Sequence, residues 1–348
     1  MRTLGLLLLA ACSSNSGGGG DDDTGIDAPT GPVEACDRSV ADYCSQVQCD
    51  MSPTSARNDA SLCPANEISC LDIDLVVSTM ADDADETQTG FGFSVGRSPD
   101  EFDLAKAAQE ASDRATRLLG ATKPKTKRTT VVLDPYITAS FLGVISSTLN
   151  GESVAKGRSL FKDRLGEGVA NSIVTLVDDP TNPKAYTATE LDGEGLAARR
   201  NVLIDGGVLQ QFVHSSYSAR RVGTRSTGNA IRGGFKGTPG VGCLALQLLP
   251  GTRDQQALIA DIDDGVLVQS VSGLHSGVNA ISGDFSVGAS GLQITKGQVA
   301  GPIREFTIAS TLQRMLHDVA EIGNDVDWLP MRAAGVSLVI RDVTMSGA

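Results

Sequence analysis

Several features are scarce or missing in this chain of 348 residues. Aromatic residues make up 4% of it, which argues against the stacking surfaces of single-stranded nucleic-acid binders. The only histidines are His214, His275 and His317, and no HExxH or HExxxH motif occurs. The chain therefore lacks the helical zinc-hydrolase motif.

An excess of basic charge is missing as well. The formal net charge is −13, and residues 1–100 account for all of it, with 17 acidic and 4 basic side chains. Residues 101–348 hold 25 of each kind. Their surface therefore offers no general electrostatic attraction to a nucleic acid. The length suits one large domain or two smaller ones.

The chain opens with a short apolar run instead of a long one. MRTLGLLLLAAC has one Arg, a run too short to span a bilayer, and small residues before Cys12. It resembles a lipoprotein signal peptide ending in a lipobox, so we expect lipidation of Cys12. Two acyl chains would hold the protein stably on the bacterial envelope, on the periplasmic side or the outer membrane. If the N-terminus is misassigned, we expect a cytoplasmic protein.

Cysteines gather near the N-terminus. With Cys12 lipidated, six remain: Cys36, Cys44, Cys49, Cys63, Cys70 and Cys243. An even number in an oxidising compartment favours disulfides, although six cysteines allow 15 pairings. A zinc cluster is the alternative, but residues 1–100 contain no CxxC pair and no His.

Composition and periodicity divide the chain into segments. They are a signal peptide (1–12), a flexible Gly/Asp-rich tether (13–35), a Cys-rich acidic segment (36–90), a short region (91–130) and a larger domain (131–348). The predicted helices cover 98–120, capped by Ser98, 135–149 and 307–323. Predicted strands cover 71–77, 128–134 and 335–347, with hairpins around Gly206-Gly207 and Lys296-Gly297. The irregular alternation favours an α+β fold of mixed twisted sheets with flanking helices.

Three patterns suggest catalysis only weakly. Gly92–Gly96 matches G-x-S-x-G around Ser94, but no helix follows directly, so a chance match is favoured. His317 and Glu321 are spaced to hold a metal on a helix, where a solvated face is the commoner role. Asp178-Asp179-Pro180 could supply an acid and a base, but it favours a turn.

A basic, glycine-rich stretch is the most unusual feature. YSARRVGTRSTGNAIRGG covers residues 217–234, and no acidic residue occurs from Gly206 to Arg253. Such a segment can bind phosphate through backbone N–H groups, but it fits neither GxxxxGK[ST] nor GxGxxG. A positive wall for a carboxylate-ended ligand, or for a partner subunit, is equally consistent.

Ordered blocks across the chain resemble one family. They are KGRSLFKDRLGEGVA, TLVDDP, LDGEG, RRNVLIDGGVLQQFVHSSYSARRVG, STGNAIR, GDFSVGASGLQITKGQVAGPI and IGNDV. In this order they resemble the TldD/PmbA (modulator of DNA gyrase) metallopeptidase family from about residue 88 onward. The resemblance implies a PmbA/TldD-like C-terminal domain at 131–348, a remnant of the family's N-terminal domain at 91–130, and a reduced, Cys-rich segment before it.

The resemblance also implies a partner. Family members pair as two homologous subunits around a chamber that degrades peptides. TldD-like subunits carry zinc on a helical HExxxH and a C-terminal Cys, whereas PmbA-like (TldE) subunits lack these ligands. Here Leu142, Gly143 and Ser147 stand where the His, Glu and His would be, and no Cys follows IGNDV. The resemblance is therefore to the PmbA-like type, with zinc expected in a TldD-like partner and none in this chain.

A peptide groove follows from the same resemblance. The predicted lining residues are Ser226, Thr227, Gly228, Asn229 and Arg232, with Gly283, Asp284, Phe285 and Ser286 nearby. An extended peptide would add to a strand there. The rival interpretation is that the basic loop docks the partner subunit. The alternative function is a lipid-anchored peptide-binding or structural envelope protein, alone or as a homodimer, without a peptidase role.

Overall fold

The computed structural model describes residues 9–11, 73–83, 86–233 and 236–347. The predicted lipobox Cys12, the tether at 13–35 and five of the clustered cysteines lie outside the described residues. Cys243 lies inside them as a buried free thiol. Within these ranges, no helix is long and apolar enough to cross a membrane.

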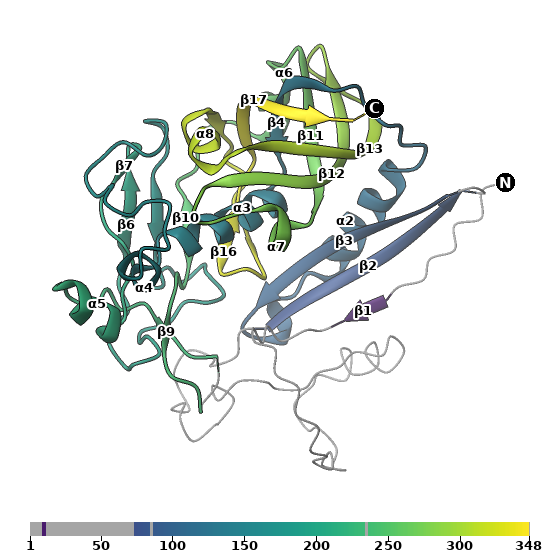
Figure 1. Cartoon of the computed structure of the whole chain (residues 1–348). Coiled ribbons are helices and arrows are strands. Elements are labelled where there is room, and N and C mark those ends of the chain that lie inside the picture. Colours follow the sequence, from purple (N-terminus) through teal and green to yellow (C-terminus); the bar gives the residue numbers. More distant parts are fainter. Residues whose placement is uncertain (1–8, 12–72, 84–85, 234–235, 348) are drawn as a thin grey trace.

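A hairpin and a helix form the N-terminal unit. Strands β2 (Ile73–Asp83) and β3 (Glu86–Gly96) pair antiparallel, and β1 (Leu9–Ala11) pairs with the other edge of β2. The predicted strand in LDIDLVV is confirmed and continues to Asp83. Helix α2 (Leu104–Arg117) lies along this hairpin (Figure 1), and its Ala107 and Ala111 form a small core cluster with Val77 of β2.

Helix α2 begins later than the sequence predicted. Pro99–Glu101 form a 3-10 turn, η2, and Asp103, not Ser98, caps the helix by accepting a hydrogen bond from the Lys106 N–H at 2.8 Å. Ser98 and Asp103 are both good N-cap residues, so the sequence alone could not choose between them. Pro99 begins the short 3-10 turn and not the helix. The helix also ends earlier than predicted, at Arg117 with Leu118 as its C-cap, and Gly120 follows with φ +73°.

The main sheet has the order β13-β12-β11-β4-β17-β14, and β13 also pairs with β17, which closes it into a ring. Its strands are β4 (Lys127–Leu133), β11 (Asp264–Ser272), β12 (Asp284–Thr295), β13 (Gln298–Thr311), β14 (Val319–Ile322) and β17 (Leu338–Ser346). The strand predicted at 128–134, the closing strand and the hairpin at Lys296-Gly297 are confirmed. Both turn residues have positive φ, as a tight hairpin turn requires.

A second mixed sheet lies beside the first. Its order is β15 (Asp327–Leu329), β16 (Ala333–Gly335), β10 (Leu246–Leu248), β5 (Leu176–Asp178), β6 (Asn201–Asp205) and β7 (Val208–Leu209). The hairpin predicted around Gly206-Gly207 joins β6 and β7 and is confirmed.

Helix α3 (Pro135–Thr148) contacts both sheets through β16 and β11. Asp134 caps it, and residues such as Phe141 and Ile145 carry its buried face into the core. The remaining elements are short: α4 (Gly151–Ala155), α5 (Ser216–Val222), α6 (Gln255–Ala260), α7 (Leu274–Gly277), β8 (Ala230–Ile231) and β9 (Gly240–Val241).

The helix predicted at 307–323 is wrong for most of its length. Residues 307–311 belong to β13, only Leu312–His317 form helix α8, and Val319–Ile322 form β14. The β-branched residues of TIAST fit a strand, and Thr311 then caps α8 by accepting from the Arg314 N–H. The predicted class, an α+β fold with mixed sheets, is confirmed.

Candidate functional site

The exposed part of α3 offers few polar groups. Leu142 is buried in the core, whereas Gly143 is exposed and has open space around it. Ser147 is exposed, and its Oγ donates to the Val144 carbonyl at 2.6 Å. Leu and Gly side chains have no donor atom for a metal, so these three positions do not fit a zinc ion. No group of three or more His, Cys, Asp or Glu side chains suited to a metal occurs in the described ranges.

Asn229 is the centre of a buried hydrogen-bond network. Its Nδ2 donates to Asp178 Oδ2 at 2.6 Å and to the Gly242 carbonyl at 3.1 Å. Its Oδ1 accepts from Thr227 Oγ1 at 2.6 Å and from Asn201 Nδ2 at 3.0 Å. All four hydrogen-bonding positions of the amide are used, and it has no exposed surface. It therefore holds residues 226–229, which we call the STGN segment, in place.

Asp178 lies beneath this segment. Its Oδ1 accepts the N–H groups of Leu244 and Ala245 at 2.8 and 2.7 Å. Burial raises the pKa of Asp178 to about 6, although the hydrogen bonds it accepts oppose that rise. Asp179 instead accepts the Thr181 N–H in a turn and lies 3.7 Å from the Arg200 guanidinium. Of the turn predicted at Asp178-Asp179-Pro180, the part from Asp179 onward is confirmed, whereas Asp178 ends β5, and the two carboxylates have separate structural roles.

The other residues of the segment differ in exposure. Ser226 and Thr227 are half-buried, and the Ser226 hydroxyl and the Thr227 N–H each donate to the His214 carbonyl at 3.1 Å. Gly228 is buried with φ +76°, and a Cβ there would press on the Ala197 carbonyl. Arg232 is exposed and donates to the Gly193 and Gly237 carbonyls at 2.7 and 3.0 Å. Arg232 is thus the residue of this set that solvent reaches most readily.

The second predicted segment begins β12. Gly283 is buried at φ +87°, and its carbonyl accepts the Leu312 N–H at 2.7 Å. Phe285 is buried edge-on against Phe141 of α3, with 6.2 Å between the ring centres. Asp284 and Ser286 are exposed. No hydrogen bond or ion pair joins this segment to residues 226–232 in the part of the chain described.

The weaker catalytic patterns do not assemble. Ser94 lies in β3 with η2 after it, and its Oγ accepts the Asp103 N–H at 3.0 Å, so the strand–helix elbow is missing. Glu321 lies on β14 and pairs with Arg253 at 2.7 Å, whereas His317 ends helix α8, so the two residues do not share a helix. His275 is exposed on α7, and His214 is buried with Nδ1 at 3.1 Å from Ser218 Oγ. Burial lowers the pKa of His214.

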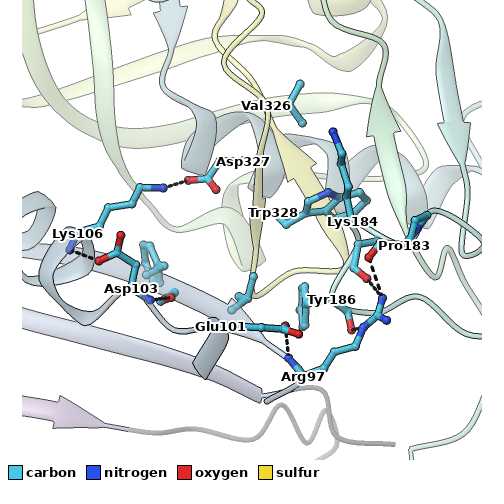
Figure 2. A pocket seen from close by; sticks show the side chains of 14 residues that line it. Arg97, Glu101, Asp103, Lys106, Pro183, Lys184, Tyr186, Val326, Asp327 and Trp328 are labelled. Atoms are coloured by element: carbon cyan, nitrogen blue, oxygen red, sulfur yellow. Dashed lines mark hydrogen bonds and ion pairs between the residues drawn. The ribbon is translucent and has the colours of Figure 1, made fainter. Parts of the chain in front are cut away.

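A pocket of about 460 Å³ lies where the N-terminal unit meets the second sheet (Figure 2). Its walls come from β3, η2 and α2, from residues 183–186, and from β15 with the only tryptophan, Trp328. Sequence reasoning missed this pocket, because its walls are far apart in the chain. The single Trp just after IGNDV was the one available sign.

Charged groups of both signs line the pocket. Lys106 Nζ lies 3.0 Å from Asp327 Oδ2, and partial burial of the ammonium is outweighed by this carboxylate, so the pKa of Lys106 is raised. The Arg97 guanidinium donates to the backbone carbonyls of Ala185 and Tyr186. These contacts bind the N-terminal unit to the rest of the molecule, and Figure 2 shows them on opposite sides of the pocket.

Comparisons with known proteins identify the class. The family profile described as "PmbA/TldA metallopeptidase C-terminal domain" matches residues 126–347. TldE from Thermococcus kodakarensis superimposes with a TM-score of 0.74 at 25% identity, covering 79% of this chain and 63% of that one. The fold is that of a metallopeptidase-related C-terminal domain.

Curated relatives give the same family. The chain is 28% identical over 251 residues to "Metalloprotease PmbA" of Escherichia coli O157:H7, which covers 71% of this chain and 53% of that protein. It is 28% identical over 179 residues to a "Metalloprotease TldD homolog" of Buchnera aphidicola, covering 51% and 37%. The chain belongs to the PmbA/TldD family, and it spans about half the length of the curated PmbA relatives it matches.

Proposed function

We propose that this protein is a non-catalytic, PmbA/TldE-like subunit of a TldD/PmbA-type metallopeptidase complex. In this proposal it lines part of a peptide-binding chamber, and a TldD-like partner bearing HExxxH supplies zinc and hydrolysis. The observation that carries the proposal is the chemistry of α3. Leu142 is buried, Gly143 has no side chain, and Ser147 is the only polar residue at the three positions.

The peptide-binding part of the proposal rests on the segments at 226–232 and 283–286. Their buried members, Asn229 and Phe285, hold backbone in fixed positions. The exposed members, Arg232, Asp284 and Ser286, are then the side chains available to a peptide. A rigid backbone beside a few exposed polar groups suits an extended ligand bound mainly through its main chain.

Attachment to the envelope is proposed from the sequence alone. Cys12 would carry the lipid, and the partner would then need an export signal of its own. The same anchor also serves the alternative function, a peptide-binding or structural envelope protein without a peptidase role. The two functions differ in whether a zinc-bearing chain accompanies this one.

Co-purification from detergent-solubilised native membranes tests the proposal. We expect a stoichiometric partner with HExxxH, zinc in the complex, and hydrolysis of unfolded peptides that a chelator abolishes and zinc restores. The isolated chain, given zinc, should hydrolyse nothing. Chelator-sensitive hydrolysis by the isolated chain would overturn the non-catalytic role. Recovery of this chain alone, without zinc or hydrolysis, would leave the alternative function.

Within a confirmed complex, Arg232→Ala tests the groove. We expect a higher KM for peptides with little change in kcat, because the arginine would contact peptide and not the reacting bond. Arg128→Ala is the control, since it removes an exposed arginine of the main sheet that pairs with Asp342. Equal effects of the two substitutions would place Arg232 outside the groove.

A further inference from the structure

Five exposed arginines mark one region of the surface. They are Arg199, Arg220, Arg221, Arg225 and Arg232, and we call this set the arginine face. Among the described residues, none of the five lies in an ion pair, whereas nearby Arg200 pairs with Asp179. Exposed charged groups that have no ion-pair partner among the described residues are available to a ligand.

Contacts between three segments bring these arginines together. Arg199 Nη2 donates to the Ser226 carbonyl at 2.9 Å, directly beside Arg225. Arg232 Nε donates to the Gly193 carbonyl at 2.7 Å. The same 193–199 segment reaches α5, because Glu194 accepts the Ser216 N–H at 2.8 Å. Helix α5, with Arg220 and Arg221 in its last turn, lies at the outer edge of the molecule (Figure 1).

Acidic groups near the arginine face are already engaged. Asp192 is buried and accepts the Ala230 N–H at 3.0 Å, and Glu194 is half-buried at the start of α5. Glu190 is the exposed exception in this segment. Since no acidic residue occurs from Gly206 to Arg253, the face carries a net positive charge on a chain whose total is −13.

Apolar side chains are exposed beside these arginines. Tyr217 is 50% exposed, and the Arg221 guanidinium lies over its ring, 5.9 Å from the centre. Val222, next along α5, is 45% exposed. Arg221 Nη1 also donates to the Tyr217 hydroxyl at 3.3 Å, and the other N–H groups of the guanidinium are left for a ligand. This small area favours a ligand of a few residues over a subunit interface, whose core is depleted of charge.

We propose that the arginine face binds acidic peptides, that is, extended chains rich in Asp and Glu, and so selects the peptides that reach the chamber. The inference rests on the proposed function, since both take a peptide as the ligand. Guanidinium groups bind carboxylates through paired hydrogen bonds, which an amide or a hydroxyl accepts less strongly. The acidic overall charge and the scarcity of aromatic residues argue against a nucleic acid as the ligand.

Fluorescence anisotropy with the isolated full chain tests this. Three labelled peptides of equal length and spacing are compared, one with Glu, one with Gln and one with Lys at the same positions. We expect the Glu peptide to bind roughly tenfold more tightly than the Gln peptide at low salt, and the Lys peptide not at all. The advantage should shrink as the ionic strength rises, because exposed charges are screened.

Variants locate the effect. Arg225→Gln should weaken binding of the Glu peptide by about two- to fivefold, and a triple Gln variant at 220, 221 and 225 by about tenfold or more. Binding of the Gln peptide should not change. The matched control is Arg341→Gln, which removes another exposed arginine, on β17, with no ion pair among the described residues.

Three outcomes would overturn the inference. They are equal binding of the Glu and Gln peptides, full binding by the triple variant, and competition by a DNA oligonucleotide of equal charge at equal concentration. If the triple variant instead lost its partner subunit while binding the Glu peptide normally, the face would be a subunit interface. Since the assay needs neither partner nor hydrolysis, failure of the proposed complex leaves its result intact. Conversely, an active complex whose peptide hydrolysis does not depend on peptide charge would support the proposed function and overturn only this inference.

Discussion

At the scale of single residues, Asp178 and Asn229 hold the STGN segment against β5. Each is fully buried, and their side chains bond to one another, to neighbouring backbone and, for Asn229, to the side chains of Thr227 and Asn201. Removing one partner of such a network leaves the others unsatisfied, which costs more than the bond itself contributes. Both residues therefore fix the backbone next to Arg232.

The raised pKa of Asp178 makes stability depend on pH. Its pKa is about 6 in the folded chain and near 3.8 otherwise. The folded state thus binds the proton more tightly, and this contribution is complete below pH 3.8 and lost as pH rises through about 6. We expect the stability advantage of the native chain over Asp178→Asn to be larger at pH 4.5 than at pH 7, by about 2 kcal/mol.

Urea unfolding of both proteins at the two pH values measures this difference. Comparison with the variant cancels the contributions of other carboxylates, such as Glu86, whose pKa is lowered chiefly by its hydrogen bond from the Gly120 N–H. A constant difference between the proteins across this range would contradict the assignment.

Arg114 also acts at this scale. It pairs with the buried Asp134 at 3.1 Å and lies over the Tyr136 ring, 6.0 Å from its centre. Arg114→Ala would leave the carboxylate without its counter-charge, and we expect a loss of about 3 kcal/mol in the free energy of unfolding. Arg117→Ala, on the same helix, removes an exposed pair with Asp113 and should cost less than about 1 kcal/mol. Similar losses in denaturant titrations of both variants would contradict this role of Arg114.

At the scale of elements, the sequence predicted those that carry their own start and stop signals. Helix α3 has Asp134 and Pro135 at its start, and both glycine-containing hairpins have the residues that their turns require. The helix prediction for residues 307–323 was wrong because a strand, a short helix and another strand in succession can imitate the helical spacing of apolar residues. Pairing with β12 and β17, which the local sequence does not encode, decides its structure.

Glycines set the distance between β3 and α2. A Cβ at Gly92 would overlap the Ala107 carbonyl, and one at Gly90 would overlap that of Ala111. We expect Gly92→Ala to force the helix outward and to cost about 1–3 kcal/mol. Gly143→Ala is the contrast, because space is open there and alanine favours a helix, so a gain of about 0.5–1 kcal/mol is expected. Melting temperatures should move in opposite directions, and a shared direction would contradict the packing argument.

At the scale of the whole molecule, the family could be predicted from ordered sequence blocks, whereas the pocket around Trp328 could not. Its walls come from residues 93–106, 183–186 and 326–328, which only tertiary packing brings together. Likewise, the sequence identified the STGN segment but not the burial of Asn229, because an amide's exposure depends on the residues that surround it.

The contacts around the pocket should make the described parts unfold together. Arg97 donates to carbonyls of residues 183–186, and Phe93 stacks on Tyr136 with 4.4 Å between ring centres. We expect far-UV circular dichroism and Trp328 fluorescence to report one urea transition in the native chain. In Arg97→Ala, the fluorescence transition should come first. Lys184→Ala, which changes an exposed side chain of the same pocket, should leave the two transitions coincident. A fluorescence transition already separate in the native chain would contradict this coupling.

Closure of the main sheet has a consequence for the order of assembly in time. The β12–β13 hairpin joins residues that are neighbours in the chain, whereas β4 pairs with β17 across some two hundred positions, with Val131 opposite Ile340. Bringing such distant segments together costs loop entropy before any contact compensates for it. We therefore expect the ring to close late and slowly, and unpaired edges of β4 and β13 to persist in folding intermediates. Aggregation during refolding should then depend on how long these edges remain unpaired before β17 joins the sheet.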